Sequence, residues 1–121
     1  MKSLIVLVVG LLAVGCEKKL TPEQKLRDSV LGEYEFKDLL GKTNKWVFLE
    51  NGVIERYKIS KKLGEEKWSV VEGEIHIVYD WGEILILRIN TDKSITLIAS
   101  IVDEKRTDWP KDKQETYKKI K

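Results

Sequence analysis

The only histidine, His76, is the first residue to consider for catalysis or metal binding. A single histidine excludes a metal site built on two histidines. A Ser-His-Asp arrangement would require Ser69 or Ser100 beside it, and no motif brings either serine there. His76 lies between Ile75 and Ile77, so strand alternation points it away from the face that these isoleucines bury. We therefore interpret His76 as an outward-facing strand residue.

Two pairs of neighbouring carboxylates could in principle serve acid–base chemistry: Glu72 with Glu74, and Asp103 with Glu104. Surface charge at the ends of strands explains both pairs more simply. The eight glycines are dispersed at expected turns, so the sequence contains no glycine-rich phosphate loop. We expect no catalytic residue, no metal site and no cofactor, and the protein is not expected to be an enzyme.

The only cysteine, Cys16, ends an apolar run that starts at Leu4. Lys2 precedes this run, and the charged segment 17–19 follows it. A membrane-spanning helix needs about 17–25 apolar residues, whereas the apolar core of a signal peptide needs roughly 7–15. The run therefore predicts a signal peptide over residues 1–15.

Ala13-Val14-Gly15-Cys16 resembles the lipobox of bacterial lipoproteins. The resemblance implies that diacylglycerol alkylates the thiol of Cys16, that the chain is cleaved between Gly15 and Cys16, and that the new amine is then acylated. Lipidation would account for an unpaired cysteine in an exported protein and would leave no Cys–His pair for catalysis. Two or more acyl chains give durable membrane anchoring. Because Glu17 rather than Asp follows the cysteine, the lipoprotein sorting pattern favours an outer membrane, if the cell has one.

The charge balance of the chain excludes a class of partner. Lys and Arg number 22 against 20 Asp and Glu, and the two signs are interspersed. Nucleic-acid binders show a basic excess or a basic stripe. We therefore expect no nucleic-acid partner, and a membrane contact that runs through the lipid anchor.

One helix and a series of strands are expected in the mature chain. Thr21-Pro22-Glu23-Gln24 has an N-cap, a proline at the first helical position and a capping-box glutamine, which predict a short helix over residues 22–31. The segment 16–31 would then hold the lipidated cysteine, a tether and this helix, and 32–121 the folded domain. Alternating or β-rich runs predict eight strands, at 32–36, 45–50, 53–60, 67–72, 74–79, 83–90, 95–102 and 115–120.

Short turns join the expected strands, and a charged loop over 103–113 precedes the last one. Asn51-Gly52 predicts a type I′ hairpin turn, which needs positive φ at both central residues. No crossover helix is available for a parallel sheet. The sequence therefore predicts a mainly β fold: a small antiparallel meander β-barrel of about eight strands with one short N-terminal helix. A flattened sandwich is the alternative.

The order of features is similar to that of lipocalin-type (calycin-like) β-barrels: a short helix, Gly32 and Tyr34 on the first strand, then hairpins and a late arginine. In that superfamily an arginine packs across a tryptophan on the first strand. Tyr34 stands in the place of the tryptophan, and the resemblance implies that Arg106 packs across its ring. It also implies a barrel that carries a small ligand at its mouth.

The barrel is expected to be solid, because an eight-stranded barrel is just wide enough for side chains to fill it. The large inward candidates are Trp46, Phe48, Trp68, Ile75, Ile77, Leu85, Leu87 and Leu97. Trp81 in a turn and Trp109 in the charged loop have no obvious reason for burial, and either cap the barrel or recognise a partner. Trp81, Arg106 and Trp109 are therefore the candidate binding residues, and 103–110 is the candidate recognition loop.

Two functional hypotheses follow. The first is a membrane-anchored, noncatalytic envelope lipoprotein whose β-domain binds another envelope component through loops at one end, with an inhibitor-type role included. The second is a small-ligand carrier of lipocalin-like type.

Overall fold

The computed structural model describes residues 20–121. The predicted signal peptide, the cleavage site at Gly15 and the lipidated Cys16 lie outside the described residues.

The helix α1 (Pro22–Val30) forms where its capping residues predict. The Thr21 hydroxyl accepts a hydrogen bond from the Gln24 amide at 3.1 Å, and the Gln24 side-chain oxygen accepts one from the Thr21 amide at 3.0 Å. These reciprocal bonds satisfy two amides that would otherwise lack partners at the start of the helix. Val30, at the other end of α1, is buried in the core.

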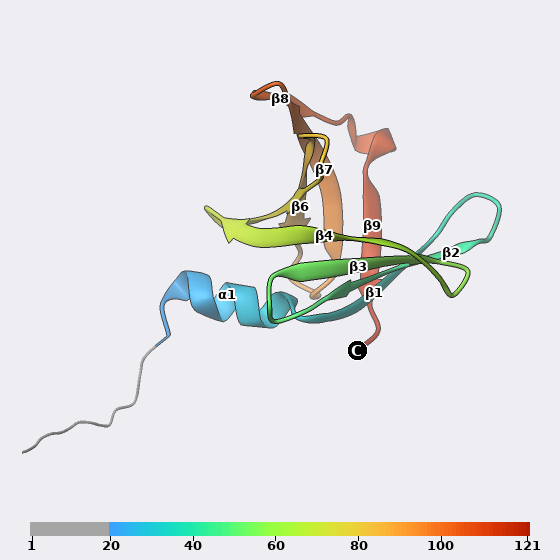
Figure 1. Ribbon diagram of the computed structural model, residues 1–121, viewed down its shortest axis with the longest axis horizontal. Helices are drawn as coiled ribbons and strands as arrows, with labels where there is room; N and C mark the ends of the chain where they lie inside the picture. The colour runs from blue at the N-terminus through green and yellow to red at the C-terminus, as the bar shows by residue number, and fades with distance from the viewer. Residues whose placement is uncertain (1–19) are drawn as a thin grey trace, which may run out of the picture.

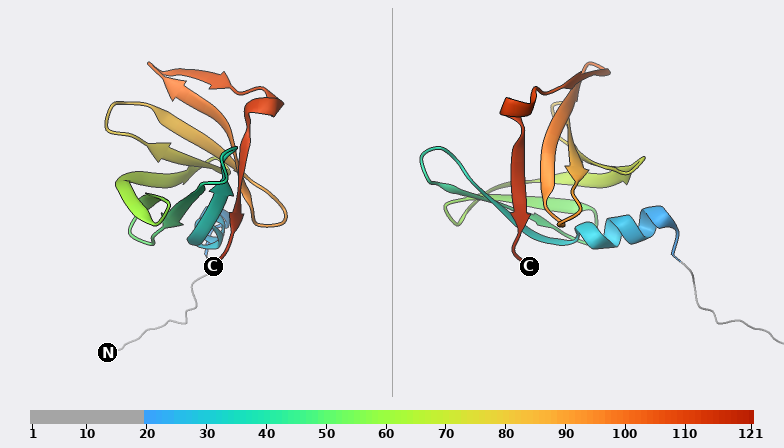
Figure 2. Two further views of the ribbon diagram at one scale, coloured as in Figure 1. Left: turned by 90° about the vertical axis from the view of Figure 1, so that its right-hand side faces the viewer. Right: turned by 180° about the vertical axis from the view of Figure 1, so that it is seen from behind.

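The remaining chain forms one antiparallel sheet that closes on itself (Figures 1 and 2). Its strands are β1 (Gly32–Lys37), β2 (Thr43–Phe48), β3 (Val53–Lys58), β4 (Lys61–Val71), β5 (Glu74–Val78), β6 (Ile84–Ile89), β7 (Ile95–Val102), β8 (Lys105–Asp108) and β9 (Glu115–Lys119). They are ordered β6-β5-β4-β3-β2-β1-β9-β7-β8, and the pairing of β6 with β7 closes a ring of eight strands. The structure therefore confirms the predicted mainly β fold, an eight-stranded barrel with one short helix. The alternative, a flattened sandwich, is not formed.

The ninth strand, β8, corrects the prediction of a charged loop over 103–113. It pairs with the second half of β7, outside the ring, and a short 3-10 helix (Lys111–Lys113) follows it. All four residues of β8 are exposed, so its sequence has no apolar alternation by which to recognise a strand. The strand β4 also begins six residues earlier than predicted, at Lys61.

The turn at Asn51-Gly52 is not the predicted type I′ turn. The Leu49 amide donates to the Val53 carbonyl at 2.9 Å, which encloses a three-residue loop, and Gly52 alone in it has positive φ. The true two-residue turns with positive φ at both positions are Ile59-Ser60, Glu72-Gly73 and Asp103-Glu104.

The barrel interior is filled by large side chains. All eight of the inward candidates chosen from the sequence are buried. The Tyr34 ring packs edge-on against Phe48 with centroids 5.4 Å apart, and Phe48 packs in the same way against Trp68 at 5.2 Å. Burial raises the pKa of Tyr34 to about 12, and its hydroxyl donates to the Val30 carbonyl at 2.8 Å. The aromatic chain thus connects the sheet to α1.

The seam of the barrel lies at β9. This strand pairs with β1 at Tyr34 and Glu35, and the two residues after it bond to the backbone of Glu33. It pairs with β7 from Ile95 to Leu97. On the inside, the Tyr117 ring of β9 stacks on Trp46 of β2, with centroids 4.1 Å apart. Side-chain packing therefore adds to the few hydrogen bonds that close the ring.

We predict that Tyr117→Leu lowers the free energy of unfolding by about 2–4 kcal/mol, because it removes a buried aromatic ring and its stacking on Trp46. Chemical denaturation measures this loss, and hydrogen exchange should accelerate first in β1 and β9. Trp81→Leu is the matched control: its stack on Tyr79 is nearly as close, at 4.4 Å, but Trp81 is 69% exposed. A control loss as large as that of Tyr117→Leu would contradict the role of the seam.

Candidate functional site

The two ends of the barrel differ, and α1 covers one of them, the helix end (Figure 1). The Arg27 guanidinium donates to the Glu50 carbonyl at 2.7 Å and lies 4.8 Å from the centre of the Trp68 ring. On the other side of α1, the Lys119 ammonium donates to the Ser29 carbonyl at 2.9 Å. The helix therefore closes this end of the core.

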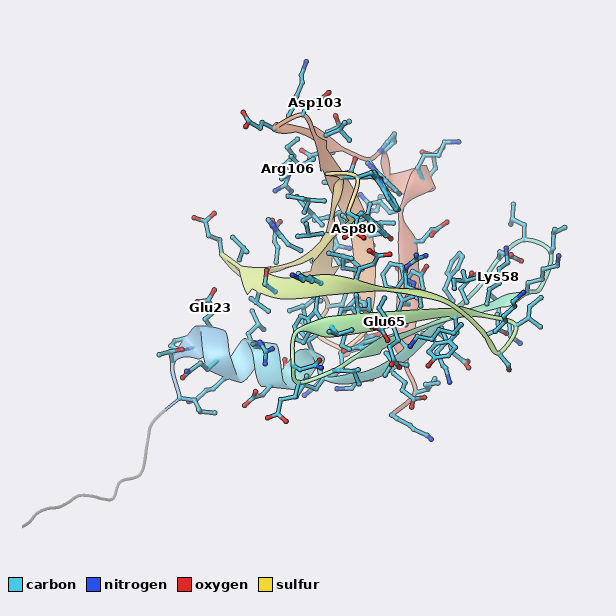
Figure 3. The ribbon with its side chains drawn as sticks, in the orientation of Figure 1. Glu23, Lys58, Glu65, Asp80, Asp103 and Arg106 are labelled. Carbon is cyan, nitrogen blue, oxygen red and sulfur yellow. The ribbon has the colours of Figure 1, made fainter. Side chains whose placement is uncertain are left out.

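The opposite end, which we call the free end, is formed by the β1–β2, β3–β4, β5–β6 and β7–β8 turns and by the segment 109–114. Each of these four turns, or the strand residue beside it, carries an exposed apolar side chain: Leu39, Leu40, Ile59, Trp81 and Val102. In Figure 3, Lys58 and Asp103 mark the ends of two hairpins, and they lie far apart around this end. The free end therefore carries exposed apolar residues at separate places rather than in one compact patch.

A charged pair lies inside the barrel toward the free end. The Arg56 guanidinium is 2.9 Å from the Glu66 carboxylate, and both residues share the inward face of the sheet with Trp46. The Glu66 side chain is 7% exposed and that of Arg56 22%. The Nε of Arg56 is buried and has no hydrogen-bond partner in the described part of the chain. Charges out of water are tolerated only when paired, so each residue depends on the other.

Two stacked aromatic rings lie beside this pair. The Arg56 guanidinium is 5.4 Å from the centre of the Tyr79 ring, on whose plane Trp81 stacks. Burial raises the pKa of the Tyr79 hydroxyl, while Arg56 opposes that rise. Trp81 remains 69% exposed, and its indole N–H donates to Glu83 at 3.2 Å. The stack presents a flat aromatic face to solvent at the free end.

Trp109, the second candidate tryptophan, is half-buried and packs against the barrel core. Its amide donates to the Ile98 carbonyl at 2.8 Å, and its own carbonyl accepts from the Gln114 side chain at 3.1 Å. The indole N–H lies 3.4 Å from the Ser100 hydroxyl. These contacts fix Trp109 as part of the cap of the free end.

Arg106, the third candidate, lies on the outer face of the barrel. Its guanidinium pairs with Glu74 at 3.1 Å and with Asp108 at 2.8 Å. Ile86, on the outward face of β6, is fully buried although it lies outside the main core cluster. Its neighbour across the strands is His76. The outer face therefore has a small apolar centre of its own, near the Arg106–Glu74 pair.

His76 faces outward, as its place between Ile75 and Ile77 predicts, but it is half-buried rather than fully exposed. Burial lowers the pKa of its imidazole; nearby Glu74 raises it, and Arg106 lowers it.

The expectation that Arg106 packs across the ring of Tyr34 is wrong, because the cation over that ring is Lys119, at 5.8 Å.

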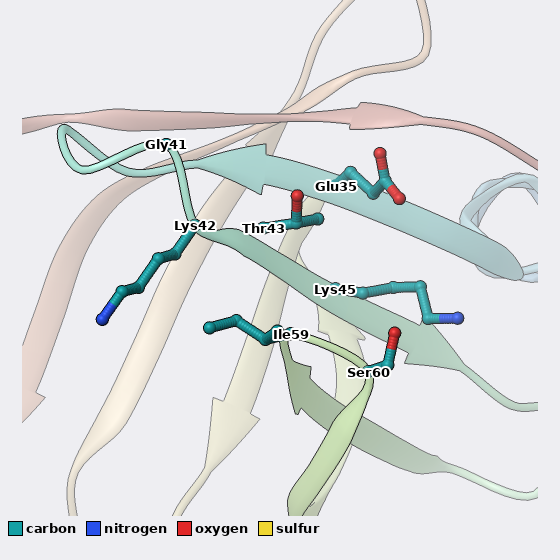
Figure 4. Close-up of a pocket in the computed structure, with 7 residues that line it drawn as sticks. All are labelled: Glu35, Gly41, Lys42, Thr43, Lys45, Ile59 and Ser60. Atoms are coloured by element: carbon teal, nitrogen blue, oxygen red, sulfur yellow. The ribbon is translucent and has the colours of Figure 1, made fainter.

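A shallow depression of about 430 Å³ lies on the outer face beside the β1–β2 and β3–β4 turns (Figure 4). Basic, hydroxyl, acidic and apolar residues line it: Glu35, Gly41, Lys42, Thr43, Lys45, Ile59 and Ser60. Sequence reasoning did not identify this site, since its residues come from three separate segments and match no motif. The pairing of β2 with β3 brings the segments at 41–45 and 59–60 together, and it continues to the Ile59 amide, which donates to the Thr43 carbonyl.

No group of three or more potential metal ligands occurs between residues 20 and 121. In the same range, no helix has the length and apolar character needed to cross a bilayer. Arg106, Trp109 and Trp81 come from the outer face, the cap and an exposed turn respectively, so they do not form a single loop.

We predict that Arg56→Leu lowers the free energy of unfolding by about 3 kcal/mol, because it leaves the Glu66 carboxylate buried without its partner. Replacing both residues with leucine should recover most of this loss, since no charge then stays buried. Lys45→Ala provides the control: its pair with Glu33, at 3.7 Å, is partly exposed and should contribute under about 1 kcal/mol. Urea denaturation of the three variants tests this, and a double variant no more stable than the single one would contradict it.

Comparison with known proteins gives no relative for this chain: no family model matches it, nor does any curated protein or any solved structure.

Proposed function

We propose that this protein is a noncatalytic lipoprotein of the cell envelope, anchored in a membrane through Cys16, whose barrel binds another envelope component at its free end. The lipobox at residues 13–16 supports the anchor, and Glu17 after the cysteine favours an outer membrane where there is one. An inhibitor-type role toward an envelope enzyme belongs to the same class of binding function.

The observation that carries the binding function is the difference between the two ends of the barrel. At the helix end, α1 buries Val30 and covers Trp68 with Arg27. At the free end, Leu39, Leu40 and Trp81 protrude into solvent. Exposed apolar side chains of this size at the end of the barrel that no helix covers are typical of an interaction surface. The chain enters α1 at the helix end, so a tether there would leave the free end accessible.

A second function, carriage of a small ligand, is favoured by one specific feature. The seam between β1 and β9 opens beyond Glu35, and a depression of about 310 Å³ lies there beside Phe36. The Phe36 ring lies 5.3 Å from that of Tyr117, so an aromatic wall backs this opening. The filled interior argues for the binding module over the carrier, because little space is left behind that wall.

We predict that Cys16→Ala abolishes incorporation of labelled palmitate and leaves the signal peptide uncleaved, because the thiol is the acylated group. Labelling in cells, followed by mass spectrometry of the N-terminus, measures both effects. Cleavage at another residue, or palmitate that persists in the variant, would contradict the proposed anchor.

We also predict that a photo-crosslinking amino acid at position 81 captures a specific envelope protein in the native cell, since Trp81 offers an exposed aromatic face at the free end. The same probe at Val71, which is exposed next to the turn at the helix end, serves as the matched control. Equal capture from both positions would contradict a binding surface at the free end.

For the carrier, native mass spectrometry of protein from its own host should show a bound small molecule, and an empty protein would exclude that alternative.

A further inference from the structure

The β1–β2 and β3–β4 turns place leucine, isoleucine and lysine side chains together at one side of the free end. Segments 37–43 and 58–63 contain five lysines and a single acidic residue, Asp38. Four of their apolar side chains are exposed, and Leu39 in the β1–β2 turn is fully exposed. We call this set the lysine–leucine patch; it comprises Leu39, Leu40, Ile59, Leu63, Lys37, Lys42, Lys58, Lys61 and Lys62.

The patch is held in a defined shape. The Asp38 carboxylate accepts hydrogen bonds from the Leu40 and Lys42 amides at 3.0 and 2.9 Å, which fixes the β1–β2 turn with both leucines at its tip. In the other turn, Ile59 has a φ of +51°. A β-branched residue in this left-handed conformation is strained, and glycine or asparagine would adopt it at lower cost. An exposed isoleucine kept in a strained turn points to a role outside the fold.

Most of the positive charge in the patch is available to a partner. Lys58 lies 4.0 Å from Asp38, and Lys62 is paired with Glu55 and Glu65. Lys37, Lys42 and Lys61 form no ion pair with any residue between 20 and 121. The patch thus combines protruding apolar tips with a ring of cations.

We propose that the lysine–leucine patch binds the surface of a bilayer that contains anionic phospholipids. Apolar side chains that protrude from a convex turn enter the boundary between headgroups and acyl chains, and lysines set one or two residues behind them meet the headgroups. A protein partner would instead need a cavity of matching shape for each tip. The depression between the two turns carries Lys42, Lys45, Thr43 and Ser60, whose N–H and O–H groups suit phosphate oxygens, with Glu35 at its edge.

The orientation of the patch indicates which bilayer it meets. Lys58 lies at the opposite side of the molecule from Glu23 in α1 (Figure 3). A protein anchored through the chain that precedes α1 can therefore present the patch to a second lipid surface. This bridging geometry rests on the proposed lipid anchor, whereas the attraction of the patch to anionic lipid does not.

Vesicle clustering by the full-length protein tests the proposal. The protein is reconstituted into neutral phosphatidylcholine vesicles, and a second population of labelled vesicles is added that contains about 30 mol% phosphatidylglycerol. We expect clustering with the anionic vesicles, none with neutral ones, and a strong reduction at about 0.5 M salt, where charge interactions are screened.

Two variants separate the contributions of the patch. Leu39→Ser with Leu40→Ser should weaken clustering at least about tenfold, because the inserted apolar surface is lost. Lys42→Gln with Lys61→Gln should weaken it about 25-fold, at about fivefold for each lysine. Both sets of positions are exposed, so the core is left intact. Ile120→Ser with Lys118→Gln, an exposed pair near the helix end, is the matched control and should cluster vesicles as the unaltered protein does.

Equal clustering of neutral and anionic vesicles, or clustering that survives the leucine variant, would overturn the proposal. The absence of clustering with equal amounts of incorporated protein would do the same. If position 40 crosslinks to a protein in the cell while vesicles stay apart, the patch binds protein instead of lipid. That result would leave the proposed binding function intact, whereas failure of the photo-crosslink at Trp81 would count against the function and not against lipid binding.

Discussion

The stack of Tyr117 on Trp46 is the interaction on which the closed barrel depends most. The ring closes between β1 and β9, which lie at opposite ends of the described chain, so a long loop must be brought together at an entropic cost. Few backbone hydrogen bonds offset that cost: β9 pairs with β1 at Tyr34 and Glu35, and the residues after β9 bond to Glu33. The rings of Trp46 and Tyr117, 4.1 Å apart, connect β2 to β9 across the inside of β1. Without closure, β1 and β9 would be open edges available for pairing with other chains.

The alternation of apolar and polar residues predicted the strands of the ring, because it directly reflects which side chains are buried in the barrel. The predicted strands at 32–36, 67–72 and 74–79 carry apolar side chains at every second residue. All eight predicted strands form, with differences at their ends. The prediction failed where this cause is missing. In β8 all residues are exposed, and in the first half of β4 the inward positions hold Gly64 and Glu66 rather than apolar residues. Pairing with β7 and with β3 forms these strands, and such long-range hydrogen bonds leave no local pattern in the sequence.

Turn types were less predictable than strands, for a related reason. Asn51-Gly52 has the composition of a two-residue turn, but the strands on either side end so that three residues must connect them. The turn at Ile59-Ser60 has a composition that argues against positive φ, yet the register of β3 and β4 demands it there. The sequence therefore identified where the chain turns, while the pairing of the strands decided how it turns.

Of the three candidate binding residues, the sequence could predict Trp81 best, because its position in a turn is a local property. The positions of Arg106 and Trp109 depend on β8, which has no signal in the sequence. The pairing of Arg106 with Glu74, 32 residues earlier, likewise follows from the ring closing through β5, β6 and β7. The lysine–leucine patch combines both kinds of information. Each of its segments is visible in the sequence, but only the antiparallel order of β1 to β4 brings the two turns to the same end.

The two ends of the barrel contribute unequally to the free energy of folding. This difference allows one end to expose apolar side chains to a partner without unfolding the barrel. At the helix end, aromatic rings and α1 bury the core completely, with the Tyr34 hydroxyl bonded to Val30. Toward the free end, the inward position of Arg56 is charged, and the pair that it forms with Glu66 contributes little net stability compared with apolar side chains of the same size. In the turns of the same end, Leu39, Leu40 and Trp81 are exposed to solvent. The packed half must therefore supply most of the free energy of folding, so that the other half can present side chains to a partner.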